Sequence, residues 1–138
     1  MKMKIGLLSP YPPLNDSVGK VYSYNLIKNC PVEYVKIGCK GSKADYVLDF
    51  KSFGLKKELK KIIKKEKIDL LHIQYIAPLY GRYTLNLNLL PVYKLKIPII
   101  TTLHEVQVSK KSGVISLIKM NILRFIQKKI VKCSDKVI

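Results

Sequence analysis

The sequence predicts an α/β domain with a mainly parallel sheet. Short apolar runs, typical of strands, alternate along the whole chain with longer segments of helical periodicity. Several of these runs are almost continuously apolar, as in strands that helices cover on both faces. A length of 138 residues and an apolar fraction of 48% suit one domain with a full core, spanning residues 1–138.

The N-terminal third of the chain predicts a strand, a loop, a helix and a second strand. Lys4–Ser9 is an apolar run closed by a proline-rich turn, which indicates a buried strand. The loop Tyr11–Gly19 follows. Lys20–Asn29 places its apolar residues on one rough helical face, and Pro31 ends this helix. Val32–Gly38 is again largely apolar and predicts the second strand.

The middle third predicts an edge strand, a helix, a buried strand and a second, interrupted helix. Asp45–Phe50 is a short edge strand or an extended segment. Gly54–Lys67 carries leucines and isoleucines on one face and lysines on the other, which is typical of an amphipathic helix. Ile68–Tyr75 is mostly apolar, as buried parallel strands are. Tyr83–Leu95 favours a helix that Pro91 kinks or breaks.

The last third repeats the alternation of strand and helix. Pro98–Leu103 is apolar and β-branched, as expected of a buried strand, and a polar loop follows it. Isoleucines at helical spacing predict a long amphipathic helix over Val114–Lys132. Asp135–Ile138 begins another apolar run with no turn, cap or polar tail behind it. We therefore expect the chain to be a segment of a longer protein or one half of a split enzyme.

The net charge of +17 leaves three interpretations open. It reflects a lysine-rich genome or a thermophilic origin, a surface that meets anionic lipid, or a nucleic-acid partner. Of the 26 basic residues only Arg82 and Arg124 are arginine, the side chain that sequence readers favour for contacts to guanine and phosphate. The composition therefore disfavours nucleic acid.

The cysteines and the N-terminus predict a cytoplasmic protein. The 3 cysteines form no C-x-x-C pair and are odd in number, which argues against a disulfide framework and a zinc site. We expect Cys30, Cys39 and Cys133 to be small buried or half-buried residues. The first apolar run is too short for a signal peptide, and no run approaches the ~18 residues of a membrane span.

In a parallel sheet, ligands bind beyond the carboxyl ends of the strands, and three such ends carry candidate residues. The first is the loop before Gly19 and Lys20. Free N–H groups at the start of the following helix, together with the lysine, suit a phosphate. The alternative is an ordinary turn in which Asp16 or Ser17 caps the helix.

The other two ends carry histidines. His72 lies inside its strand and is expected to be a packed core residue, whereas Gln74 and Tyr75 are nearer the strand end and better placed to meet a ligand. His104 and Glu105 follow the strand Pro98–Leu103, either as a titratable pair that the strand delivers to a site or as a strand end that has reached water. Adjacent residues of an extended strand point to opposite faces, so the two need not act on the same atom.

A further carboxylate pair is interpreted as a chance match. Glu58 and Glu66 fit the E-x7-E pattern of retaining glycosyltransferases, but both lie among lysines on an exposed helix face. Glu58 is expected to pair with Lys61 in an ordinary helical ion pair.

Four motifs in order resemble the N-terminal domain of family 4 glycosyltransferases, which have the two-domain GT-B fold. YPPLNDSVGKVYSYNL is similar to the first loop and helix of that family, IDLLHIQY to its D-h-h-H-h-Q strand, and IPIITTLHEV to its strand ending in T-h-H-[DE]. CSDKVI is similar to its sixth strand. The resemblance covers essentially the whole chain and implies a Rossmann-like three-layer domain.

The resemblance also implies a function. In that family the N-terminal domain binds the acceptor, a sugar, membrane lipid or polysaccharide, and closes over a nucleotide-diphospho-sugar held mainly by the C-terminal domain. Gly19 would approach the donor diphosphate, and His104 would face the transferred sugar. Transfer retains the anomeric configuration without a metal or other cofactor. The basic helices Gly54–Lys67 and Val114–Lys132 are candidates for docking on the inner face of a membrane; the alternative is that both simply cover the sheet and expose their lysines.

The chain departs from the family pattern in two ways. Val18 precedes a single Gly19 where many members have a glycine pair, and the C-terminal domain with its nucleotide pocket is absent, so the chain alone should be inactive. The competing hypothesis is a non-catalytic basic α/β module that binds an anionic membrane or nucleic-acid surface. The sequence names neither the donor sugar nor the acceptor.

Overall fold

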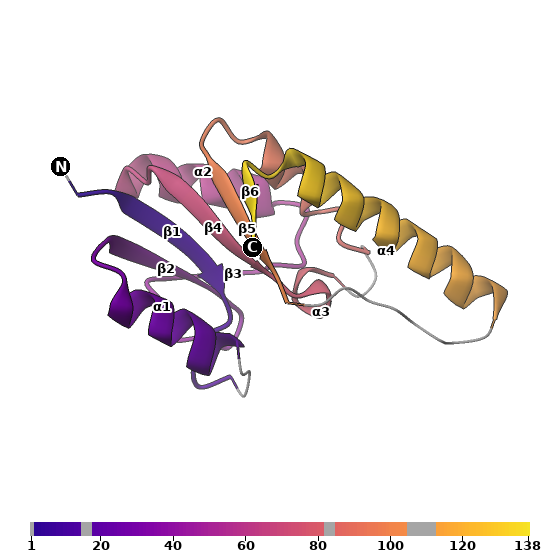
Figure 1. Cartoon of the computed structure of the whole chain (residues 1–138), viewed down its shortest axis with the longest axis horizontal. Helices are drawn as coiled ribbons and strands as arrows, with labels where there is room; N and C mark the ends of the chain where they lie inside the picture. Colours follow the sequence, from indigo (N-terminus) through magenta and orange to yellow (C-terminus); the bar gives the residue numbers. More distant parts are fainter. Residues whose placement is uncertain (1, 15–17, 82–84, 105–112) are drawn as a thin grey trace.

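Parallel strands in one sheet form the centre of the molecule (Figure 1). The computed structural model describes residues 2–14, 18–81, 85–104 and 113–138, apart from the side chains of residues 18–20. Within these ranges the sheet has 6 strands, in the order β3-β2-β1-β4-β5-β6, and every pair is parallel. The strands are β1 (Lys4–Ser9), β2 (Glu33–Cys39), β3 (Tyr46–Leu48), β4 (Leu70–Tyr75), β5 (Ile99–Leu103) and β6 (Lys136–Val137).

Helical segments cover the two faces unequally. Along the chain they are the π-helix η1 (Val18–Ser23), which continues into α1 (Tyr24–Asn29), then α2 (Leu55–Glu66), α3 (Ala77–Tyr80), the 3-10 helix η2 (Leu90–Lys94) and α4 (Val114–Cys133). Helices α2, η2 and α4 share one face, whereas α1 lies in front of the sheet in Figure 1. This placement follows from right-handed crossovers, because the chain moves along the sheet in one direction through β2 and β3 and in the other from β4 onward. The predicted α/β, Rossmann-like three-layer fold is confirmed.

The hydrophobic core lies on the α2 face. Leu55, Leu59 and Ile62 of α2 pack with Ile126 and Ile130 of α4 against the apolar side chains of the central strands. The periodicity that predicted α2 is thus the periodicity of its buried positions, whereas α4 buries only the isoleucines of its C-terminal half. Each apolar side chain buried in this way stabilises the fold by about 1.5–3 kcal/mol.

Three sequence predictions need correction. The helix predicted over Tyr83–Leu95 is wrong over its described residues, 85–95, because Leu85 and Asn86 adopt left-handed backbone angles and only the short η2 is helical. The first helical segment begins at Val18, so Gly19 lies inside a helical turn rather than in the preceding loop. Cys39 is buried as predicted, but Cys30 and Cys133 lie at helix ends and are exposed.

The connection between β2 and β3 depends on Gly38. A Cβ atom there would lie 2.5 Å from Ser42 Cβ and 3.0 Å from Ala44 Cβ. We expect Gly38→Ala to lower the free energy of unfolding by about 1–3 kcal/mol in urea denaturation, because the tight connection must shift. Gly54→Ala is the matched control, since its nearest contact would be Ser52 Oγ at 3.3 Å. Equal effects of the two substitutions would contradict the steric argument.

Candidate functional site

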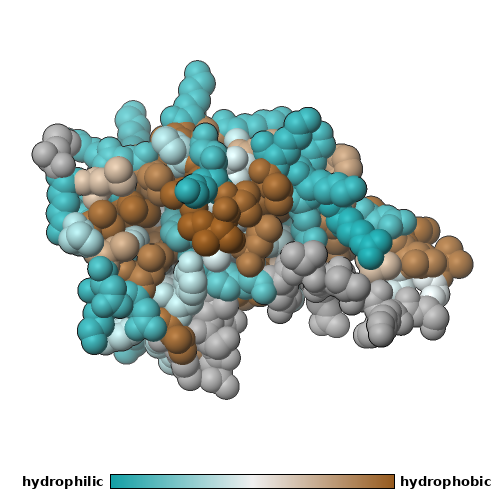
Figure 2. Space-filling model, in the orientation of Figure 1, coloured by the Kyte–Doolittle hydropathy of each residue, from teal (hydrophilic) through white to brown (hydrophobic). Residues whose placement is uncertain are grey.

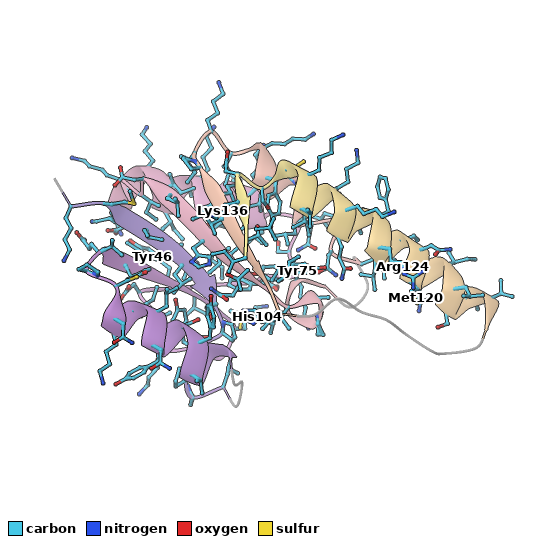
Figure 3. All side chains as sticks on the ribbon, in the orientation of Figure 1. Tyr46, Tyr75, His104, Met120, Arg124 and Lys136 are labelled. Carbon is cyan, nitrogen blue, oxygen red and sulfur yellow. The ribbon has the colours of Figure 1, made fainter. Side chains whose placement is uncertain are left out.

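The site lies where the strand order reverses. Successive connections leave β1 and β4 in opposite directions, so the carboxyl ends of these neighbouring strands open the crevice in which parallel sheets bind ligands. His104 follows β5 directly, and its backbone N–H donates to the Tyr75 carbonyl at 3.3 Å. Figure 3 shows His104 at this end of the sheet, near α1. The sheet therefore brings His104 next to the end of β4.

Four polar side chains form a continuous hydrogen-bonded group across β4 and β5. His72 Nε2 lies 2.8 Å from Thr102 Oγ1 and 3.3 Å from Gln74 Nε2. Gln74 Oε1 in turn lies 2.5 Å from His104 Nε2. Positions 72 and 74, like 102 and 104, are two residues apart, so each pair projects from the same face of its strand. We call His72, Gln74, Thr102 and His104 the histidine network.

Burial keeps His72 neutral. The side chain is 6% exposed, and burial, with a smaller contribution from His104, lowers the pKa of His72 to about 4. In the arrangement in which both neighbours donate, the one lone pair of His72 Nε2 is shared between the Thr102 hydroxyl, which is the shorter contact, and the Gln74 amide. His104 Nε2–H then donates to the Gln74 carbonyl oxygen. Gln74 thereby fixes the orientation of the His104 ring.

The His104 ring faces a cavity beside the first helix. The cavity has a volume of about 630 Å³ and is bounded on its other side by η1 and α1, including Tyr22 and Asn25. The Tyr22 ring contacts His104 edge-to-face, with 5.1 Å between ring centroids and an interplanar angle of 84°. An imidazole in this position can donate or accept a hydrogen bond, or transfer a proton, at a ligand in the cavity.

The first helix is tied to the same end of the sheet. Ser9, at the end of β1, places its Oγ 2.6 Å from Ser23 Oγ, and both side chains are fully buried. Tyr22, Ser23 and Thr102 did not emerge as candidates from the sequence. Only Thr102 carried a readable signal, because it lies two positions before His104 and shares its face.

The remaining predicted site residues are placed differently. Tyr75 points to the opposite face, into the core, where its ring stacks on Tyr80 with centroids 6.0 Å apart. Burial raises the pKa of its hydroxyl, and the nearby Gln127 amide partly opposes this. Gly19 lies in η1; the Lys20 side chain and all of Glu105 lie outside the described part of the chain. The structure thus joins the side chains of Gln74 and His104, whereas the Tyr75 side chain lies on the other face of the sheet and only its backbone carbonyl contacts His104.

The two glutamates of the E-x7-E match lie away from this site. Glu58 Oε1 pairs with Lys61 Nζ at 3.1 Å on α2, which confirms the helical ion pair expected from the sequence. Glu66 accepts from the Tyr46 hydroxyl and lies 3.9 Å from Lys4 Nζ. Both carboxylates therefore have structural partners.

Comparison with protein-family models, curated proteins and solved structures finds no match for this chain. Among the described helices, none combines the length and the apolar character needed to cross a bilayer. Any function must therefore be argued from the site itself.

Proposed function

We propose that this chain is the acceptor-side half of a retaining glycosyltransferase of the GT-B fold, which works with a nucleotide-sugar-binding half. One observation carries the proposal: the Gln74 carbonyl holds His104 at the cavity beside the first helix, near the crevice at the carboxyl ends of the neighbouring strands β1 and β4. An oriented imidazole beside a cavity large enough for a ligand can hydrogen-bond sugar hydroxyls. It can also stabilise the charge that develops on the transferred sugar in the transition state.

In this proposal the reaction divides between the two halves. The nucleotide half presents the nucleotide-diphospho-sugar, and the acceptor occupies this chain's cavity. The bond between the anomeric carbon and the diphosphate oxygen breaks, the acceptor hydroxyl oxygen bonds to the same face of that carbon, and its proton passes to the leaving diphosphate. His104 hydrogen-bonds the transferred sugar, and the helical turn around Gly19 lies nearest the diphosphate. Gln74 acts as a positioning residue.

The test of this function uses the full-length protein as its reading frame encodes it. Purified protein is incubated with a panel of nucleotide-diphospho-sugars and with lipid and glycan acceptors, and release of nucleoside diphosphate is measured with and without acceptor. We expect acceptor-dependent release with at least one donor. Absence of release with every donor, from folded protein, would reject the proposal.

A second candidate function, binding to an anionic membrane surface, rests on the start of α4. Large apolar side chains there are exposed, with Val114 at 74%, Ile115 at 72% and Ile118 at 55%. Figure 2 shows this apolar surface at the far end of the molecule. The 20 residues of α4 include no acidic side chain but carry Lys and Arg along their length. Such a helix end suits the interface of an anionic bilayer.

Replacing Ile115 and Ile118 together by aspartate should prevent this binding. We expect the double variant to lose sedimentation with phosphatidylserine-containing vesicles, because two apolar contacts are removed and two anionic charges are added. Phe53→Asp is the control, since Phe53 is 67% exposed and lies outside α4. If wild-type protein does not bind these vesicles even at low salt, the second candidate fails.

A further inference from the structure

Helix α1 covers the sheet without burying any of its own residues. Its first flank faces the cavity that His104 borders; the opposite flank faces a second cavity of about 700 Å³. This second cavity has apolar walls, built by Tyr24 and Ile27 of α1 on one side and by Tyr11, Pro12 and Pro13 on the other. A helix that covers a sheet normally buries an apolar stripe against it. Helix α1 does not, and the cavity is the space left between this helix and the sheet.

The wall opposite α1 is fixed by hydrogen bonds to β1 and to the connection between β2 and β3. Tyr11 is buried, and its hydroxyl donates to the Leu7 carbonyl at 2.9 Å. The Tyr11 N–H donates to Ser42 Oγ at 3.0 Å, and the Lys43 N–H donates to the Pro12 carbonyl at 2.8 Å. This wall is therefore preformed, which reduces the entropy cost of binding a ligand.

Three lysines complete the cavity. Lys28 comes from α1, Lys36 from β2 and Lys43 from the connection between β2 and β3. Within the described residues, none of the three belongs to an ion pair, and no carboxylate lines the cavity. Asp45 is adjacent, but its Oδ2 accepts from the Lys36 backbone N–H at 2.7 Å. Lys36 is half-buried, as is usual for a lysine whose stem lies along the protein surface while its ammonium group reaches water.

We propose that this space, the lysine cavity, binds an organic phosphate: a phosphate monoester carried on an apolar aryl or alkyl body. The body fits against the tyrosine, proline and isoleucine walls. Three ammonium groups match the charge of almost two that a phosphate monoester carries near neutral pH, better than the single charge of a carboxylate. The proposal stands on this cavity alone and does not depend on a glycosyltransferase activity.

The test measures binding of defined probes to the intact chain by isothermal titration calorimetry. The probes are phenyl phosphate, n-hexyl phosphate, inorganic phosphate and phenol. We expect phenyl or hexyl phosphate to bind at least about tenfold more tightly than inorganic phosphate or phenol, since only they carry both features. The tighter of the two identifies the body as aryl or alkyl.

Matched lysine variants separate a local site from general charge. We expect K28Q/K36Q/K43Q to weaken binding of the tighter probe by about a hundredfold, through loss of charge-assisted hydrogen bonds. K56Q/K60Q/K64Q removes the same charge from a different groove, between α2 and η2, and should leave binding within about twofold. K28Q/K43Q, which leaves the half-buried Lys36 in place, is the folded alternative if the first triple variant does not fold, and about a tenfold loss is expected. Tyr24→Ser should weaken the organic probes but not inorganic phosphate.

Three results would overturn the proposal. The first is equal affinity for inorganic phosphate and both organic phosphates, which would leave the apolar walls without a role. The second is an equal loss of binding in the two triple variants, which would show that the net charge of +17 attracts anions unspecifically. The third is the absence of measurable binding by either organic phosphate at millimolar concentration.

Discussion

Replacing His104 by alanine is expected to slow sugar transfer by the full-length protein roughly 10²-fold or more. The reason is loss of a hydrogen bond that strengthens as charge develops on the transferred sugar, the kind of contact whose removal lowers kcat. The 2.5 Å contact to Gln74 holds the ring in place before the substrate binds. The measurement is steady-state kinetics with the donor identified in the nucleotide-sugar panel.

Two further variants distinguish a direct role of His104 from a structural one. Gln74→Ala leaves the imidazole present but unoriented, so kcat should fall by roughly tenfold with little change in KM. Lys57→Ala, on the exposed side of α2, should leave both constants unchanged. An unchanged kcat in His104→Ala would remove that residue from the proposed mechanism, even if the protein proves to be a glycosyltransferase.

The strands were predictable because burial in a parallel sheet leaves a local signal. Lys4–Ser9 has the same bounds in the prediction and in the structure, since a strand covered on both faces must be apolar at successive positions. The segment Tyr83–Leu95 had no equivalent constraint. The conformation of its described part depends on Asn86, which is fully buried with left-handed backbone angles. The surrounding structure, rather than local helix propensity, selects that conformation.

The site was predictable only in part, because its geometry depends on strand register. Periodicity alone places His72 with Gln74, and Thr102 with His104. It does not show that Gln74 pairs opposite Thr102, which brings the two halves of the histidine network into contact. The approach of Tyr22 to His104 depends on how the first helix docks, and no sequence pattern encodes that.

The histidine network should also make the protein less stable in acid. The pKa of His72 is about 4 in the folded protein, whereas an unperturbed histidine has a value of 6.5. Between these two values the unfolded chain binds more protons than the folded chain, so the free energy of unfolding falls as the pH is lowered from about 6.5 to about 4. The difference between the two pKa values corresponds to at most about 3 kcal/mol. Urea denaturation at several pH values measures this slope.

His72→Gln should flatten that slope, whatever it does to stability at neutral pH, because glutamine does not titrate. His104→Gln provides the comparison, because the chain has 2 histidines and this variant keeps only His72. Any dependence of the free energy of unfolding on pH that remains in it comes from His72 or from carboxylates. The lowered pKa of Asp49, caused first by its hydrogen bond to Lys40, affects stability mainly below about pH 5 and so overlaps only the acid end of this window. An unchanged slope in His72→Gln would mean that His72 is not buried as a neutral hydrogen-bond acceptor in the folded protein.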